Sequence, residues 1–174
     1  TDKSLKEKNL KDQIDSIKKE LLNYKIKPDY KENLELSENI KNLNKQLELI
    51  KIQNIIKDKN KNIIKDSNVG SAILRQQVLT DLPTKELRNI VDQSKKDIKQ
   101  GVVVGFSTFE GKVGVAVGVT SQLTKKYDAV KLVKIASKIL GGKGGGGRKD
   151  FAQAGGIKND KIEEAFKAVR EEIN

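Results

Sequence analysis

Residues 141–156 read GGKGGGGRKDFAQAGG, and eight of these sixteen residues are glycine. The chain of 174 residues has fourteen glycines, so more than half of them lie in this stretch. Glycine loses more backbone freedom on folding than other residues and contributes no side-chain packing. Such a density indicates that the backbone adopts left-handed angles here or comes close to another group. A flexible Gly/Ser linker is not expected, because Arg148, Asp150 and Gln153 follow the glycines at set offsets.

The stretch resembles a signature of the C-terminal (C-Ala) region of alanyl-tRNA synthetases, which reads G-G-x-G-G-G-R-x-D-x-A-Q-x-G. The glycine run has one residue more than the shorter form of that pattern. Related DHH-associated domains of nucleases and phosphodiesterases share the fold but typically carry histidine where Arg148 stands. The resemblance implies a C-Ala region that contains a DHH-associated-type domain. The matching positions after the run are Arg148, Asp150, Ala152, Gln153 and Gly155.

Composition excludes several kinds of chemistry. The chain has no histidine and no cysteine, so it cannot form a Ser-His-Asp triad, a Cys-His nucleophile pair or a zinc site of those ligands. No apolar run approaches the roughly 18 residues of a membrane helix, and the N-terminus lacks the pattern of a signal peptide. We therefore expect a non-catalytic, cytoplasmic fragment of a longer protein.

Basic residues are concentrated beside the glycine run. The formal net charge is +11, and residues 125–149 hold eight basic residues and one acidic residue. Abundant Lys, Asn and Ile are also what an AT-rich genome produces, and that bias explains a general basic excess without any function. The bias does not explain the clustering, which favours contact with nucleic acid.

Residues 1–66 predict a helical arm. Apolar residues three or four apart predict a helix over residues 4–24, and Pro28 ends it or follows its end. Asp29 and Glu32 have the spacing of a capping box that opens a second helix, which runs to roughly residue 60.

Five apolar residues of the second helix step by 4, 3, 4 and 3, which is the a/d rhythm of a coiled coil. We expect the arm to form a homodimer through this seam. The alternatives are a hairpin that closes on itself or one that packs on the globular part. The seam residues are Leu36, Ile40, Leu43, Leu47 and Ile50.

Residues 67–174 predict a globular α/β domain. Strands are expected over residues 72–79 and 102–106, separated by a helix that begins near Pro83. After a hairpin turn, valine alternates with small residues in a third strand, so one face is branched and the other is nearly bare backbone. The bare face predicts close packing of a helix, in preference to a ligand groove. The valines are Val113, Val115, Val117 and Val119, and the small residues are Gly114, Ala116 and Gly118.

A helix expected over residues 128–140 leads into a glycine-rich loop over residues 141–147. Lys131, Lys134 and Lys138 fall on one outer face of that helix. The predicted fold class is α/β (α+β): an N-terminal helical hairpin or coiled-coil arm, followed by a mixed-sheet domain covered by helices.

Three chemistries compete for the glycine-rich loop. A phosphate-binding P-loop needs G-x-x-x-x-G-K-[ST] between a strand and a helix, whereas here Gly144 follows Lys143 and the loop leaves a helix. A purely structural turn would pair Arg148 with Asp150. Contact with RNA would use bare backbone to let a phosphate or ribose come close, with charge from the neighbouring cations. The family resemblance favours RNA.

The resemblance implies a parent alanine–tRNA ligase and a region that binds the outer corner of tRNA(Ala), helping aminoacylation and editing domains act on one tRNA. ATP, Mg and Zn would belong to domains outside this chain, so no cofactor or metal is expected here. Alternatives are the C-terminal nucleic-acid-binding half of a DHH-type phosphodiesterase or exonuclease, and a purely dimerising module. The predicted RNA-binding residues are Lys131, Lys134, Lys138, Lys143, Gly144, Gly145, Arg148 and Lys149, and the predicted loop-structuring residues are Asp150 and Gln153.

Overall fold

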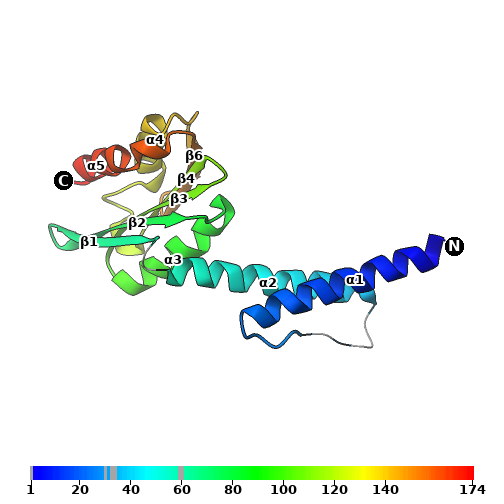
Figure 1. The fold of residues 1–174 in the computed structure, drawn as a ribbon. Helices are drawn as coiled ribbons and strands as arrows, with labels where there is room; N and C mark the ends of the chain where they lie inside the picture. The colour runs from blue at the N-terminus through cyan, green and yellow to red at the C-terminus, as the bar shows by residue number, and fades with distance from the viewer. Residues whose placement is uncertain (1, 30, 32–34, 59–60) are drawn as a thin grey trace. The chain divides into compact units, whose positions relative to one another are not determined.

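The structure is a computed structural model that describes residues 2–29, 31, 35–58 and 61–174. It divides into two compact units, Thr1–Lys57 and Asp58–Asn174. The first unit is helical, and the second contains a sheet covered by helices (Figure 1).

The first unit consists of two helices, α1 (Asp2–Asn23) and α2 (Leu36–Lys57), which confirms the predicted helical hairpin. Helix α2 begins at Leu36, so Asp29 does not cap it, and Glu32 of the predicted capping box lies outside the described residues. No described helix combines the length and the apolar character that crossing a membrane requires. The residues buried between the two helices are Ile14, Leu21, Leu43 and Leu47, with Ile17, Leu36, Ile40 and Ile50 packed beside them.

The seam predicted for a coiled coil packs within the same chain. Leu43 and Leu47 of α2 form one apolar cluster with residues of α1. The connection between the helices is tied to α2 by Asn39, whose side-chain amide donates to the carbonyl of Lys31 at 2.8 Å and accepts from its N–H at 3.2 Å. The hairpin therefore closes on itself, which is one of the alternatives above, and pairing with a second copy stays a prediction.

The second unit is built on a sheet of six strands. They are β1 (Ile63–Val69), β2 (Ala72–Thr80), β3 (Gly101–Phe109), β4 (Lys112–Val119), β5 (Gly145–Arg148) and β6 (Phe151–Gly156). The covering helices are α3 (Leu87–Ile98), α4 (Ala129–Ile139) and α5 (Ile162–Ile173). The strand order is β1-β2-β3-β4-β6-β5. Among the strands of the described residues, β2 and β3 are parallel neighbours and the other neighbouring pairs are antiparallel, which confirms the mixed sheet.

Three strands, β1, β5 and β6, have no counterpart among the predicted elements. In the edge strand β1 only Val69 is buried, so β1 lacks the alternation that reveals a half-buried strand. Because β1 pairs with β2, the second unit begins at Asp58, before the boundary expected at residue 67. Strand β5 lies largely within the predicted loop 141–147 and pairs with β6. It could not be predicted from its sequence because glycine is a poor strand former.

The alternation in β4 separates the two sides of the sheet. Its valines face the large core that α4 and α5 complete. On the other side α3 packs directly on bare backbone, since a Cβ at Gly118 would fall 2.5 Å from Cγ1 of Val91. Figure 1 shows α3 on one side of the sheet and α4 with α5 on the other. The predicted close packing of a helix on the smooth face is confirmed.

Gly118→Ala is expected to destabilise the second unit by about 1–3 kcal/mol, because the added methyl group overlaps Val91 and β4 is held by neighbours on both edges. Gly155→Ala is the matched control, since its Cβ would meet nothing closer than the carbonyl oxygen of Val113 at 3.9 Å. Urea unfolding measures both. Equal stabilities of the two variants would show that the close approach of α3 imposes no constraint.

Candidate nucleic-acid interface

The glycine-rich stretch folds as a hairpin that is fastened to α4. The buried hydroxyl of Ser137 in α4 lies 3.2 Å from the carbonyl oxygens of both Gly144 and Gly155. A Cβ at Gly142 would fall 1.9 Å from the same Gly155 oxygen and 2.3 Å from the Ser137 hydroxyl. Glycine at position 142 is therefore required for the chain to leave α4 and reach β5.

Packing also accounts for glycine at two positions of β5 itself. A Cβ at Gly145 would fall 2.6 Å from the Cβ of Ala154, and one at Gly147 would fall 2.5 Å from the Cα of Ala152. Gly146 differs from both. A Cβ there would meet no described heavy atom within 4 Å, and its φ is not in the left-handed region. Gly146 is thus glycine without a packing or conformational requirement, on the exposed edge strand of the sheet.

Arg148 and Asp150 form an ion pair at the end of this hairpin. Nε and one Nη of Arg148 donate to the two carboxylate oxygens of Asp150 at 3.0 and 3.3 Å. These hydrogen bonds raise the pKa of Arg148 and lower the pKa of the Asp150 carboxyl. The Arg148 side chain is 70% exposed, so solvent screens the pair and its contribution to stability is small. The pairing that a structural turn would use is therefore present.

Asp150 also joins the hairpin to the rest of the sheet. Its backbone carbonyl accepts from the N–H of Val119 at 2.9 Å and from Nζ of Lys95 at 3.4 Å. Its carboxylate lies 3.9 Å from the same Lys95 nitrogen. Asp150 thus links the β5–β6 turn to β4 and α3. Gln153, the second residue predicted to structure the loop, is exposed on β6.

The register of β5 and β6 decides which side of the sheet each side chain faces. Ala152 and Ala154 are buried in the core with α4 and α5, so Phe151 and Gln153 face the α3 side. Arg148 pairs with Phe151 and faces the α3 side as well. The guanidinium carbon of Arg88 lies 5.1 Å from the centre of the Phe151 ring, within the range of a cation–π contact.

The lysines predicted on α4 lie on the opposite side of the sheet from Arg148. Lys131 forms an ion pair with Glu172 of α5, and Lys143 and Lys149 are exposed near the two ends of β5. Arg148 therefore lies apart from the α4 lysines, whereas Lys149 and Gly144 adjoin α4. The carbonyl of Lys149 accepts from the N–H of Ala129 at 3.0 Å, and the carbonyl of Gly144 lies 3.2 Å from the Ser137 hydroxyl. The exposed lysines of α4 are Lys131, Lys134 and Lys138.

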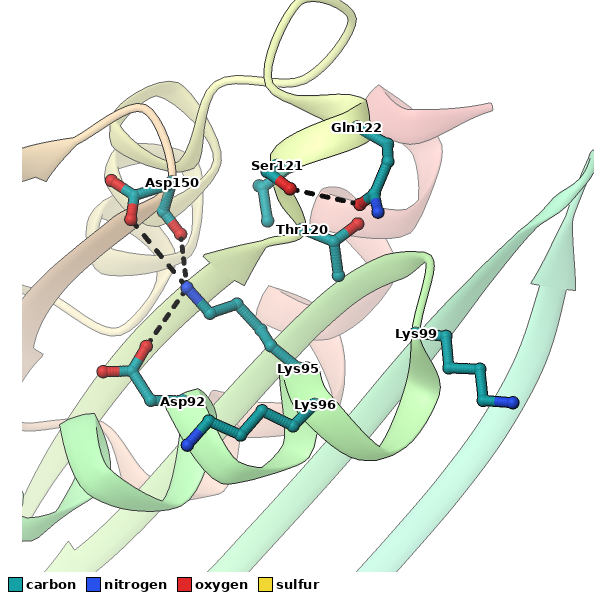
Figure 2. A pocket seen from close by; sticks show the side chains of 9 residues that line it. Asp92, Lys95, Lys96, Lys99, Thr120, Ser121, Gln122 and Asp150 are labelled. Atoms are coloured by element: carbon teal, nitrogen blue, oxygen red, sulfur yellow. Dashed lines mark hydrogen bonds and ion pairs between the residues drawn. The ribbon is translucent and has the colours of Figure 1, made fainter.

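Two hollows open on the α3 side. The smaller has a volume of about 230 Å³ and brings Arg88 of α3 together with the β5–β6 hairpin. The larger, of about 460 Å³, lies between the C-terminal end of α3 and the 3-10 turn Ser121–Leu123 that follows β4 (Figure 2). The smaller is lined by Arg88, Gly146, Gly147, Arg148, Phe151 and Gln153. The larger is lined by Asp92, Lys95, Lys96, Lys99, Val119, Thr120, Ser121, Gln122 and Asp150.

The cations of α3 are absent from the sequence-based prediction. They lie outside its buried apolar stripe: Lys96 and the C-cap residue Lys99 are exposed, whereas the stem of Lys95 packs over Gly118 of β4. Helical spacing, which placed the α4 lysines on one outer face, could also have marked these residues as candidates. They lie far from the glycine run in the sequence, so the sequence alone does not show that they lie close to the hairpin in the fold. The cations are Arg88, Lys95, Lys96 and Lys99.

Clusters of side chains that could hold a metal ion are absent from the described part of the chain. Those residues include no group of three carboxylates placed to hold a metal ion, and the whole sequence has neither histidine nor cysteine.

Curated relatives with high identity to this chain are alanine–tRNA ligases. The protein from Hyphomonas neptunium is 57% identical over 86 residues, which are 49% of this chain and 10% of the relative. The protein from Granulibacter bethesdensis is 46% identical over 107 residues, which are 62% of this chain and 12% of the relative. The chain therefore spans about a tenth of the length of these relatives.

A solved structure and a family model match the sheet-containing part of the chain. The C-Ala domain from Aquifex aeolicus alanyl-tRNA synthetase is 37% identical, with a TM-score of 0.58 over 63% of this chain and 96% of that one. The sequence model of the DHHA1 domain matches residues 70–174. The chain therefore belongs to the DHHA1 domain family, and its resemblance to the C-Ala region of alanyl-tRNA synthetases is confirmed.

Proposed function

We propose that this chain is a non-catalytic tRNA-binding region of an alanine–tRNA ligase. In this proposal it contacts the outer corner of tRNA(Ala) and helps the aminoacylation and editing domains act on one tRNA. The similarity to alanine–tRNA ligases and to a C-Ala domain supports the assignment. ATP, magnesium and zinc would bind to domains outside this chain, and the parent enzyme would act in the cytoplasm.

One observation carries the proposal: Gly146 offers bare backbone that packing does not explain. It lines the smaller hollow between Arg88 and Arg148, on a strand whose outer edge has no neighbour in the sheet. A phosphate or ribose can approach such a backbone closely and accept hydrogen bonds from it. The alternative function, the nucleic-acid-binding half of a DHH-type phosphodiesterase, would also account for the glycines. The ligase is preferred because the relatives with high identity are alanine–tRNA ligases.

Charged side chains on either side of Gly146 suit phosphate. Lys143, Arg148 and Lys149 are all exposed, and Arg148 can offer a bidentate contact once it leaves Asp150. Aromatic residues make up 4% of the chain, which disfavours binding of single strands by base stacking. A folded RNA recognised by shape, phosphate and 2′-hydroxyl groups fits this surface better.

Filter binding with whole tRNA tests the RNA proposal. About four phosphate contacts should give a slope of log affinity against log salt of roughly −3 to −4. Arg148→Ala should weaken binding by about 1–3 kcal/mol, the range of hydrogen bonds to charged groups. A Lys3→Ala/Lys6→Ala variant of the arm is the control and should bind like the wild type. Unchanged binding by Arg148→Ala, together with a loss in the arm variant, would rule out the hairpin as the interface.

We further propose that the arm pairs with a second copy, through a face other than the buried seam. Leu49 is 54% exposed, and Ile56, seven residues later and on the same face of α2, is 38% exposed. A large apolar side chain of this exposure favours an intermolecular contact. Leu43 and Leu47 cannot supply it, because they are buried inside the hairpin.

Sedimentation velocity tests the dimer. The wild type should be dimeric at ~100 μM, a concentration at which an interface of about 5 kcal/mol is populated. Leu49→Glu should give a monomer with an intact hairpin. Asn44→Glu introduces the same charge at another exposed position of α2 and should leave the dimer unchanged. A wild type that is monomeric at this concentration would refute the proposal.

A further inference from the structure

We propose that the larger hollow on the α3 side binds phosphate groups of the RNA backbone, through Lys96 and Lys99. The inference rests on the proposed RNA-binding function. It adds that the RNA crosses the α3 side of the sheet, beyond Arg148, and does not lie over the lysines of α4.

The three lysines of the hollow differ in how they are held. Lys95 is 17% exposed, and its Nζ lies 3.1 Å from a carboxylate oxygen of Asp92 and 3.9 Å from one of Asp150. Lys96 and Lys99 are exposed, and neither takes part in an ion pair with a described residue. Figure 2 shows the Lys95 amino group directed at Asp92 and Asp150, while the side chains of Lys96 and Lys99 extend to opposite sides. Lys95 is thus a structural cation, and the other two are available to a ligand.

Lys99 is held in an unusual backbone conformation. Its φ is +61°, in a region that favours glycine, at the residue that ends α3. A residue other than glycine is strained there, and strained positions are concentrated at functional sites.

Hydroxyl groups on the opposite wall complement the lysines. The Thr120 hydroxyl accepts a hydrogen bond from the N–H of Gly101 at 3.0 Å, which leaves its own proton available to a phosphate oxygen. Ser121 beside it is exposed and is hydrogen-bonded only loosely, at 3.4 Å, to Gln122. Ammonium and hydroxyl donors around one hollow suit a phosphate group, which is an acceptor only.

Asp150 connects this hollow to the hairpin. Its carboxylate lies between Arg148, which lines the smaller hollow, and Lys95, which lines the larger. The two hollows are therefore neighbours on the same side of the sheet. A continuous phosphodiester chain can place one phosphate at Arg148 and later ones at Lys96 and Lys99.

The α4 side is a poorer surface for a polyanion. Lys131 is neutralised there by Glu172. The adjoining helix α5 carries four glutamates against two cations, Lys167 and Arg170, so its net charge of −2 repels phosphate. One of the glutamates, Glu164, is paired with Lys161.

Two charge-matched variants of the whole chain test which side binds. Lys96→Gln/Lys99→Gln removes two exposed charges on the α3 side, and Lys134→Gln/Lys138→Gln removes two on the α4 side. With whole tRNA at ~0.1 M salt, the α3 variant should bind roughly 10-fold more weakly, with a salt slope less steep by about 1 per lysine. The α4 variant should bind within about 2-fold of the wild type, because it loses no phosphate contact.

Lysine acetylation of the wild-type chain gives a second readout that does not depend on variants. Bound tRNA should protect Lys96 and Lys99, and AMP at millimolar concentration should not. Equal losses in the two variants, a larger loss in the α4 variant, or protection by AMP but not by tRNA would overturn the inference. A wild type that binds no tRNA would instead overturn the proposed function, and this inference with it.

Discussion

The hydroxyl of Ser137 fastens the glycine-rich hairpin on which the proposed contacts of Gly146 and Arg148 depend. It sits on the buried face of α4, within hydrogen-bond distance of two carbonyl oxygens from different arms of the glycine-rich hairpin. The Gly155 carbonyl can approach the helix so closely only because Gly142 has no side chain to displace it. The sheet thereby gains β5 and β6, and Arg148 is placed on the α3 side.

Close packing explains why positions 145 and 147 of β5 are glycine, but it does not explain the glycine at position 146. Gly145 and Gly147 face α4 and its neighbours at distances that exclude a methyl group. Gly146 points the other way, into open space beside Arg88 and Arg148. The same short strand therefore has a structural face and an exposed face, and the exposed one carries the cations.

The sequence predicts the elements whose patterns report burial. The valines of β4 and the apolar stripe of α3 alternate or recur with the period of their element, and both lie where expected. Strand β1 was not predicted because it is an edge strand with a polar composition. Strand β5 was not predicted because its glycines show no alternation of apolar and polar residues. Both are defined by pairing with a distant strand, which no local pattern reports.

Part of the candidate site could be predicted and part could not. The glycine motif identified Arg148 and its partner Asp150, which do pair. The side of the sheet that Arg148 faces depends on the β5–β6 register, and a shift of one residue would reverse it. For this reason Lys96 and Lys99, more than forty positions earlier in the chain, were not connected to the hairpin by sequence alone.

The central claim is that the bare backbone of Gly146 allows the close approach of RNA, and Gly146→Leu tests it most directly. The leucine side chain enters open space, so the thermal midpoint of unfolding should stay within about 2 °C of the wild type, as is usual for surface substitutions. Binding of whole tRNA should fall by at least roughly 10-fold, or 1.4 kcal/mol, because the side chain keeps the phosphate from the backbone. An equally stable variant that binds tRNA as the wild type does would contradict the account.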